Sequence, residues 1–389
     1  MVPNGWSIKT LENLATVERG KFSARPRNDP KYYGGEIPFV QTGDIASAKT
    51  YLSSFSQTLN EDGLKVSRIF PKNSILITIA ANIGDTAITS FDVACPDSLV
   101  GIQPKQGTDC FWLNSFLETC KDDLDGKATQ NAQKNINLQV LKPLEILTPP
   151  LPEQRKIAKI LSTWDKAITT TEKLIETSKQ QKKALMQQLL TGKKRLVNPD
   201  TGKAFEGDWK KVELGKLLDY KQPTPYLVKS TEYSNEYPTP VLTAGKTFIL
   251  GYSNEDFGIF REELPAIIFD DFTTASKFVD FPFKAKSSAM KILIAKDGVS
   301  IKYVYEAMQV LNYPVGGHQR HWISIFANLV IGLPEPEEQQ KIASVLTAAD
   351  KEIEILEAKL THFKQEKKAL MQQLLTGKRR VKVDEMEVA

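Results

Sequence analysis

Apolar residues recur at alternating spacings of four and three along two stretches of the chain. The first series is Ile157, Leu161, Trp164, Ile168, Thr171, Ile175, Ser178, Lys182, Leu185 and Leu189. The second is Ile342, Leu346, Ala349, Ile353, Leu356, Leu360, Phe363, Lys367, Leu370 and Leu374. A seam sustained over about five heptads indicates a coiled coil. Each stretch predicts a helix of about 40 residues, about 60 Å long, and Gly192 and Gly377 suit its left-handed C-terminal cap.

The two helices belong to an internal repeat. The dodecamer KKALMQQLLTGK occurs at Lys182–Lys193 and again, 185 residues later, at Lys367–Lys378. The same offset aligns EQRKIAKILSTWDKAI with EQQKIASVLTAADKEI, and LQVLKPLEI with ISIFANLVI. The beginnings of the two halves also match, at a different offset, through Trp6 and Trp209. Such a duplication predicts pseudo-twofold symmetry or a bivalent reader.

Each helix is preceded by a block of short β-rich runs, turns and helical pieces. Strands are predicted within Ile37–Ala46, Asn73–Thr89 and Asp92–Pro104 of the first block. In the second block they are predicted within Thr239–Ser253, Pro265–Val279 and Met290–Val304. The fold class is therefore α+β: two similar mixed α/β domains in a pseudo-twofold arrangement, separated by two long helices that form an antiparallel coiled coil. The alternative is that each helix is buried separately in its own domain. The predicted boundaries are 1–150 and 196–332 for the domains, 151–195 and 333–380 for the helices, and 381–389 for a tail.

Charge does not by itself indicate a ligand. The net charge is +4, but residues 151–195 carry 11 Lys or Arg against 4 Asp or Glu, whereas each block carries 15 against 16. A DNA-binding domain usually shows a basic footprint. The longest apolar runs are too short for a membrane span, and the N-terminus lacks the features of a signal peptide. Three widely spaced cysteines favour a reducing cytoplasm.

Several motifs, in their order, make the chain resemble the specificity subunit of type I restriction–modification systems. In the first half they are IPFVQTGDI, ANIGDTAI, QKNINL, PPLPEQRKIAKIL and ALMQQLLTGK. In the second half they are HQRHWISIF, LPEPEEQQKIASVL and the repeated ALMQQLLTGK. The resemblance extends from about Trp6 to Arg380. The second block departs from the first, with TPVLTAGK where a Thr-Gly-Asp loop is expected.

The resemblance implies a mechanism for the chain. Each block would be a target recognition domain that reads one half of a bipartite site on double-stranded DNA. The helices would set the gap between the half-sites and dock two modification subunits. Those subunits would hold S-adenosylmethionine and methylate adenine at N6, and nuclease/translocase subunits would join them. The chain itself would need no cofactor or metal and would catalyse no reaction.

Loops next to the predicted strands supply the side chains that can read base edges. In the first block the candidates are Lys21, Arg25, Arg27, Gln41, Thr42, Asp44, Asn82, Gln130, Gln133, Lys134 and Asn135. In the second block they are Thr243, Lys246, Thr273, Thr274, Lys277, His318, Gln319, Arg320 and His321. For each of them an ordinary exposed loop residue is the competing interpretation, and the QTGD segment also suits a structural turn.

Three other hypotheses remain open. The partner could be one fused methylase–nuclease polypeptide, as in type IIB-like enzymes. The coiled coil could instead join two protein-binding domains in a scaffold that does not bind DNA. Asp270 and Asp271 could serve a nuclease, although no nucleophile–base signature accompanies them. The spacing of His318 and His321 suits a metal site, but no cysteine lies near them in sequence.

Overall fold

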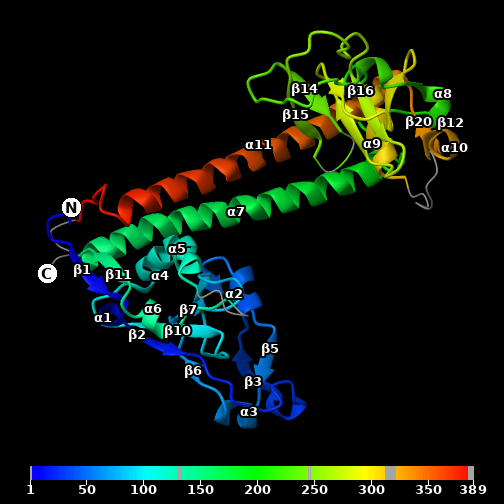
Figure 1. Cartoon of the computed structure of the whole chain (residues 1–389). Helices are drawn as coiled ribbons and strands as arrows, with labels where there is room; N and C mark the ends of the chain where they lie inside the picture. Colours follow the sequence, from blue (N-terminus) through cyan, green and yellow to red (C-terminus); the bar gives the residue numbers. More distant parts are fainter. Residues whose placement is uncertain (1, 129–133, 244, 246, 312–320, 384–389) are drawn as a thin grey trace. The chain divides into compact units, whose positions relative to one another are not determined.

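The computed structural model describes residues 2–128, 134–243, 245, 247–311 and 321–383. The chain forms two compact units. Unit 1 consists of Met1–Glu172 and Ala358–Ala389, and unit 2 consists of Lys173–Glu357. Each unit contains one mixed α/β block and one half of each long helix (Figure 1).

The long helices are α7 (Leu151–Leu189) and α11 (Pro336–Leu374), of 39 residues each. In unit 1 the beginning of α7 shares a core with the end of α11, through Ile157 and Leu374. In unit 2 the end of α7 shares a core with the beginning of α11, through Leu189 and Ile342. The two helices therefore pack antiparallel, which confirms the prediction and excludes two helices buried separately.

The predicted seam faces inward on both helices. Ten apolar residues of the seam were proposed to pair the helices, and all ten are buried or half-buried: Ile157, Leu161, Ile168, Leu185, Leu189, Ile342, Leu346, Ile353, Leu370 and Leu374. Each helix is followed by a glycine in the left-handed region, Gly192 with φ +70° and Gly377 with φ +68°. This confirms the predicted helix ends, since a residue with a side chain is strained in that conformation.

Unit 1 contains two main sheets. The five-stranded sheet has the order β2 (Ala15–Arg19), β10 (Leu99–Pro104), β7 (Ile75–Thr78), β8 (Thr86–Thr89) and β4 (Tyr51–Leu52). The four-stranded sheet has the order β5 (Gln57–Leu59), β3 (Tyr33–Phe39), β9 (Val93–Ala94) and β6 (Ile69–Phe70). The strands β1 (Ser7–Thr10) and β11 (Glu145–Thr148) form a separate pair. The helices are α1 (Leu11–Leu14), α2 (Thr42–Ser47), α3 (Glu61–Lys65), α4 (Cys110–Thr119), α5 (Lys121–Gly126) and α6 (Leu138–Leu141).

Unit 2 repeats this plan with different residues. Its four-stranded sheet has the order β13 (Leu218–Lys221), β19 (Met290–Ala295), β16 (Ala266–Asp270) and β17 (Ser276–Val279). Its three-stranded sheet has the order β15 (Ile249–Ser253), β14 (Thr239–Leu242) and β18 (Lys284–Ala285). The strands β12 (Lys210–Glu213) and β20 (Val330–Leu333) form the separate pair. The helices are α8 (Leu214–Leu217), α9 (Ile301–Gln309) and α10 (His321–Ser324).

The strand pairing of the two units corresponds step by step. β2, β10, β7 and β8 pair antiparallel in the same order as β13, β19, β16 and β17. In the second sheet, β3 pairs antiparallel with β5 and parallel with β9, as β14 does with β15 and β18. The mixed α/β prediction is therefore confirmed, and two blocks without obvious sequence similarity share one topology.

Two predicted strand segments also contain helices. Residues Thr42–Ser47 form α2, because Asp44 accepts a hydrogen bond from the backbone N–H of Gln41 at 2.7 Å and closes the first turn. In the segment Met290–Val304 the predicted strand is β19, which ends at Ala295, and the helical piece predicted from IKYVYEAMQVLN is confirmed as α9, which begins at Ile301. Ser300 caps α9 by accepting from the N–H of Tyr303 at 3.4 Å.

Candidate nucleic-acid interface

In unit 1 the turn between β7 and β8 brings together two of the predicted DNA-reading loops. Asn82 is exposed in this turn, next to Ala81, which has φ +64°. Asn135 forms a β-bridge with Ala80, and the N–H of Ile136 donates to the carbonyl of Ile79 at 3.0 Å. The loop before α6 therefore lies against the β7–β8 turn. Two exposed amide side chains come from segments more than 50 residues apart in sequence.

Unit 2 has the same arrangement at the turn between β16 and β17. Asp270 Oδ1 accepts from the N–H groups of Phe272 and Thr273 at 2.8 and 2.9 Å. Thr274 has φ +60°, which is unusual for a β-branched residue. The N–H of Trp322 donates to Asp271 Oδ1 at 2.9 Å, so the beginning of α10 lies against this turn. In unit 1 the constrained turn thus lies against the segment before α6, and in unit 2 it lies against α10 itself.

The two acidic residues considered for nuclease chemistry have structural contacts. Asp270 caps the turn, and Asp271 is buried, with its carboxylate 3.8 Å from the ammonium of Lys291. Among residues 2–128, 134–243, 245, 247–311 and 321–383, no three His, Cys, Asp or Glu side chains gather in a way that could hold a metal ion. Over the same residues, no helix is long and apolar enough to cross a membrane.

The QTGD segment is tied into the fold by its own side chains. Asp44 also accepts from the hydroxyl of Ser56 at 2.9 Å, and Gln41 Nε2 donates to Gln57 Oε1 at 3.1 Å. Thr42, the first residue of α2, is half-buried. These contacts orient the segment, which forms the first turn of helix α2. Its structural role is therefore observed, and base contacts there remain a prediction.

The three basic residues that follow β2 are all exposed: Lys21, Arg25 and Arg27. Arg27 forms a bidentate ion pair with Asp97 at 2.9 and 3.0 Å. Lys134 similarly pairs with Asp125 at 2.6 Å. A phosphate group would have to compete with these carboxylates, although exposed pairs of this kind contribute little to stability.

The remaining candidates differ in accessibility. Thr243 is half-buried and accepts from the N–H of Gly245 at 3.3 Å, whereas Thr273 and Lys277 are exposed and Thr274 is buried. Six candidates lie outside the described residues: Gln130, Gln133, Lys246, His318, Gln319 and Arg320. His321 is the first residue of α10.

Phe272 is a candidate that the sequence did not single out. It lies at the β16–β17 turn with 51% of its surface exposed. A hollow of about 220 Å³ adjoins the same turn, lined by Thr273, Thr274, Ser276 and Gln309 among others. An exposed aromatic side chain on a turn held by buried contacts can meet a base or a thymine methyl group. The sequence feature that could have identified Phe272 is its position directly after Asp270 and Asp271, since aspartates favour turns.

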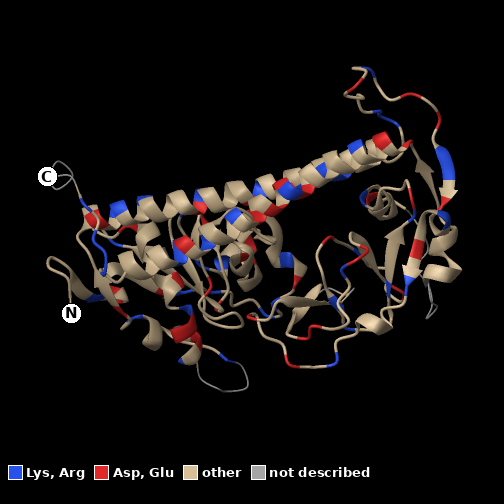
Figure 2. Ribbon diagram, turned by 90° about the horizontal axis from the view of Figure 1, so that it is seen from above, with Lys and Arg blue, Asp and Glu red and all other residues tan. Residues whose placement is uncertain are grey.

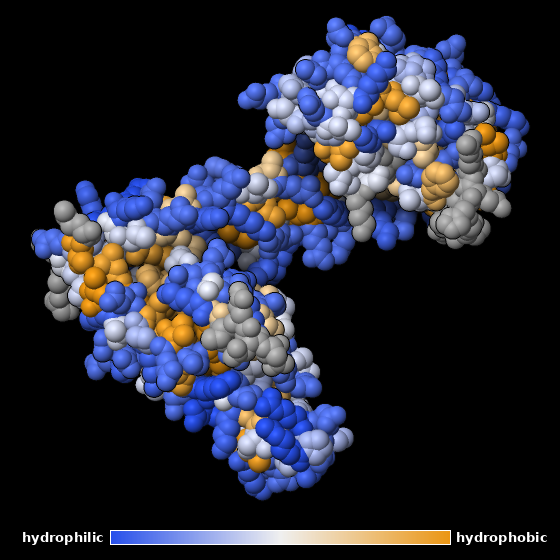
Figure 3. Space-filling view, viewed as in Figure 1, coloured by the Kyte–Doolittle hydropathy of each residue, from blue (hydrophilic) through white to orange (hydrophobic). Residues whose placement is uncertain are grey.

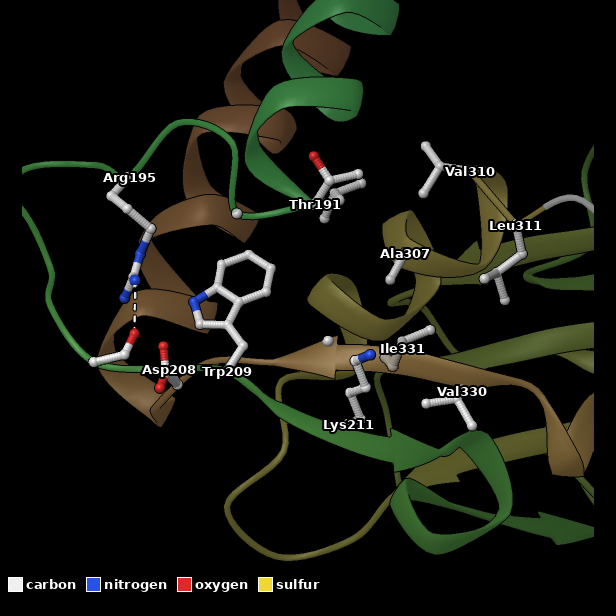
Figure 4. Close-up of a pocket in the computed structure, with 14 residues that line it drawn as sticks. Thr191, Arg195, Asp208, Trp209, Lys211, Ala307, Val310, Leu311, Val330 and Ile331 are labelled. Carbon is white, nitrogen blue, oxygen red and sulfur yellow. Dashed lines mark hydrogen bonds between the residues drawn. The ribbon is translucent and has the colours of Figure 1, made fainter.

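A second recurring feature is a clasp at the end of each long helix. In unit 2, Arg195 follows α7, donates to Glu338 Oε1 at 2.6 Å and lies over the ring of Trp209. The indole N–H of Trp209 donates to Glu338 Oε2 at 3.1 Å. Figure 4 shows Arg195 and Trp209 side by side at a cavity of about 820 Å³, with apolar side chains such as Val310 on its other side.

Unit 1 builds the same clasp from the residues at the equivalent positions. Arg380 follows α11, its Nε donates to Glu153 Oε2 at 2.9 Å, and its guanidinium lies over the ring of Trp6. The indole N–H of Trp6 donates to the same oxygen at 3.1 Å. The match between Trp6 and Trp209 in the sequence therefore reflects one structural role performed twice.

Charge is spread along the helices rather than collected in one basic face. Figure 2 shows basic and acidic residues interspersed along the long helices. The face in Figure 3 is largely hydrophilic, with apolar residues in separate patches. The two constrained turns are the better-defined candidates, because hydrogen bonds hold both of them.

Two α/β units of corresponding strand order, each built on antiparallel helices and carrying a constrained turn, describe a duplicated protein. The family model for the type I restriction modification DNA specificity domain matches residues 3–179 and 206–365. The chain therefore belongs to the family of type I restriction–modification specificity subunits.

Individual relatives agree with this assignment. The EcoR124I/EcoR124II specificity subunit of Escherichia coli is 48% identical over 145 residues, which is 36% of this chain and 35% of that protein. The putative MjaX specificity subunit of Methanocaldococcus jannaschii is 27% identical over 419 aligned residues, covering 98% of this chain and 95% of that protein. The solved S subunit from M. genitalium has the same fold, with a TM-score of 0.65 at 15% identity, over 96% of this chain and 98% of that chain.

Proposed function

We propose that this specificity subunit reads a bipartite DNA site, one half with each α/β block. The observation that carries the proposal is the pair of equivalent turns, β7–β8 and β16–β17, on sheets that share the order of four strands. Their side chains differ: Asn82 is exposed in one, and Phe272 and Thr273 are exposed in the other. Equal scaffolds with different reading residues suit two different half-sites.

Direct reading of bases requires side chains held in place, because hydrogen bonds to base edges depend on geometry. Asn82 is held by a turn that is closed at both ends by β7 and β8, and the N–H of Asp85 donates to Thr78 Oγ1 at 3.0 Å. Thr273 is held by Asp270. In both units the fold positions the backbone and leaves the side chain accessible. We therefore assign these two turns to the surfaces that contact the half-sites.

The antiparallel helices act as the spacer between the half-sites and as the dock for two modification subunits. The duplicated dodecamer supports this role, since two copies of one partner need two equivalent surfaces. One solved relative, with a TM-score of 0.55, is described in terms of complex assembly and conformational transition of the type I R-M system. By family membership, catalysis, S-adenosylmethionine and DNA translocation belong to the partner subunits, in the cytoplasm.

The proposal is tested by methylome sequencing of a host that expresses the methyltransferase encoded beside this chain, with and without the chain. We expect adenine-N6 methylation at one bipartite motif only when both are present. The Asn82→Ala variant should lower methylation by altering one half of the motif, while Lys203→Ala, an exposed change in the connector after α7, should not. Methylation that is independent of this chain would contradict the proposal and favour a scaffold that does not bind DNA.

A further inference from the structure

Each unit contains a lysine in the middle of the coiled-coil seam, where an apolar residue would be expected. These are Lys182 and Lys367, the first residues of the two dodecamer copies, and their side chains are only 16% and 15% exposed. The next residues, Lys183 and Lys368, are exposed. Only the first lysine of each pair is directed inward, and its ammonium group must find partners there.

In unit 2 the partners of Lys182 come from two other helices. Its ammonium lies 2.5 Å from Asp350 of α11 and 3.2 Å from Glu306 of α9. Lys302, also on α9, completes the group at 2.9 Å from Asp350 and 2.7 Å from Glu306. The side chain of Glu306 has no exposed surface. Four charges therefore join α7, α11 and the helix of the α/β block.

Unit 1 has a corresponding cluster. Lys367 of α11 lies 2.5 Å from Asp165 of α7 and 3.8 Å from Glu118 of α4. Asn114 Nδ2 holds Glu118 at 3.0 Å, and the Thr50 hydroxyl donates to Asp165 at 2.8 Å. Asp165 and Asp350 are themselves equivalent positions of the repeat. The cluster thus joins the same three kinds of element as in unit 2.

A second contact ties the N-cap residue of each block helix, α4 or α9, to a long helix. Gln154 of α7 accepts from the N–H of Asp109, which caps α4, at 2.8 Å. Gln339 of α11 accepts from the N–H of Ser300, which caps α9, at 2.9 Å. Both glutamines are 1% exposed. Together with the shared hydrophobic core, these two polar contacts along the helix fix the direction of the block.

Ionic groups in a helix seam usually define geometry at the expense of stability. We propose that the two lysine-centred clusters, Lys182–Asp350–Lys302–Glu306 and Lys367–Asp165–Glu118, are positioning groups that determine the gap the subunit accepts between its half-sites. They act by holding each reading block at one angle and one register on the coiled coil. This inference rests on the proposed bipartite function. It adds that gap selectivity is set by these seven residues as well as by helix length.

The test replaces the unit 2 cluster with apolar residues of similar size: Lys182→Met, Asp350→Leu, Lys302→Met and Glu306→Leu together. Replacing a whole buried ionic cluster by apolar residues of similar volume often costs little stability. We expect the melting temperature to be kept, both half-site sequences to be retained, and methylation at sites with a gap one base pair longer or shorter to rise at least tenfold. The milder Glu306→Gln variant should show the same change to a smaller extent, and it covers the case in which the fourfold variant does not fold.

Lys203→Met is the control, because this lysine of unit 2 is exposed in the connector after α7, outside the long helices and both reading turns. It should leave gap selectivity unchanged. Hydrogen exchange provides a readout that does not depend on DNA: amides of α9 should exchange faster in the cluster variants than in the control. Unchanged gap selectivity and unchanged α9 exchange in both cluster variants would overturn the inference while the bipartite function stands. Absence of any bipartite motif with the unaltered chain would overturn both.

Discussion

At the scale of single residues, the buried carboxylates are the positions where one change has the largest effect. Glu338 has a side chain that is 2% exposed; it forms an ion pair with Arg195 and accepts a hydrogen bond from the indole N–H of Trp209. A buried carboxylate that loses its cation keeps its desolvation cost without compensation. The clasp therefore depends on all three groups together.

We predict that Arg195→Met lowers the free energy of unfolding by about 3 kcal/mol, because Glu338 is left buried and charged. The measurement is urea unfolding followed by the fluorescence of the tryptophans. Lys194→Met is the control, since Lys194 is the exposed neighbour of Arg195, and it should change stability by less than about 0.5 kcal/mol. Equal effects of the two variants would show that the clasp does not stabilise unit 2.

The ionic cluster of unit 2 predicts a pH dependence. Burial alone would raise the pKa of Asp350, but hydrogen bonds from Lys182 and Lys302 outweigh it and hold the pKa below its ordinary value of 3.8. A carboxylate whose pKa is lowered by folding stabilises the folded state above the unfolded-state pKa, and this stability is lost as the pH falls through the folded-state pKa. Asp350→Asn should therefore cost about 1 kcal/mol at pH 6, a modest figure because the side chain is partly exposed. The difference should shrink in unfolding curves recorded at successively lower pH from 3.8 downwards. A difference that does not shrink as the pH falls would contradict the assignment.

Glu118 should behave in the opposite way. Burial raises the pKa of this carboxyl group above its ordinary value of 4.5, and Lys367 offsets only part of the shift. Folding therefore disfavours the ionised form, so its contribution to stability falls as the pH rises from 4.5 through the raised pKa. Glu118→Gln should leave stability at pH 7 unchanged or slightly higher, measured by the same unfolding curves. If Glu118→Gln lowered the free energy of unfolding at pH 7 by more than about 1 kcal/mol, the raised pKa of Glu118 would be contradicted. An ionised Glu118 that costs stability is consistent with a positioning role.

At the scale of elements, the β7–β8 and β16–β17 turns carry the prediction about DNA. Phe272→Ala should weaken binding of the assembled complex to its own site at least tenfold, with no change in melting temperature, because the side chain is exposed in the absence of DNA. Fluorescence anisotropy with a labelled duplex measures the affinity. Val197→Ala, which removes another exposed apolar side chain of unit 2, is the control. Equal affinity of Phe272→Ala and the unaltered protein would remove this turn from the interface.

The elements also show what the sequence could and could not predict. Heptad spacing is a local signal, so both long helices and their ends were predictable, and Lys182 and Lys367 were visible as polar interruptions of the seam. The pairing of β7 with β8 and of β16 with β17 was not recognised as equivalent, because strand order depends on contacts between distant residues. The contact between Asp271 and Trp322 is of the same kind. The helix at Thr42–Ser47 was missed because a capping carboxylate overrode the strand pattern.

At the scale of the whole molecule, the duplication shows which structural features the two units share and which differ between them. The clasps, the seam lysines and the buried glutamines recur in both units at equivalent positions of the repeat. The turns at the sheet ends differ. On the function we propose, the shared features would face two equal partners, and the differing turns would face the two halves of an asymmetric site. The domain boundaries at 150, 195, 332 and 380 remain predictions, and they define the segments to exchange.

The most direct test of this account exchanges one block. Residues 1–150 are replaced by the corresponding block of a relative with a different site, and the methylome is determined with the same methyltransferase. We predict a bipartite motif in which one half is new, while the other half and the gap are those of the unaltered chain. The reciprocal exchange of residues 196–332 should alter the opposite half. A single exchange that alters both halves, or leaves both unchanged, would contradict the assignment of one half-site to each block.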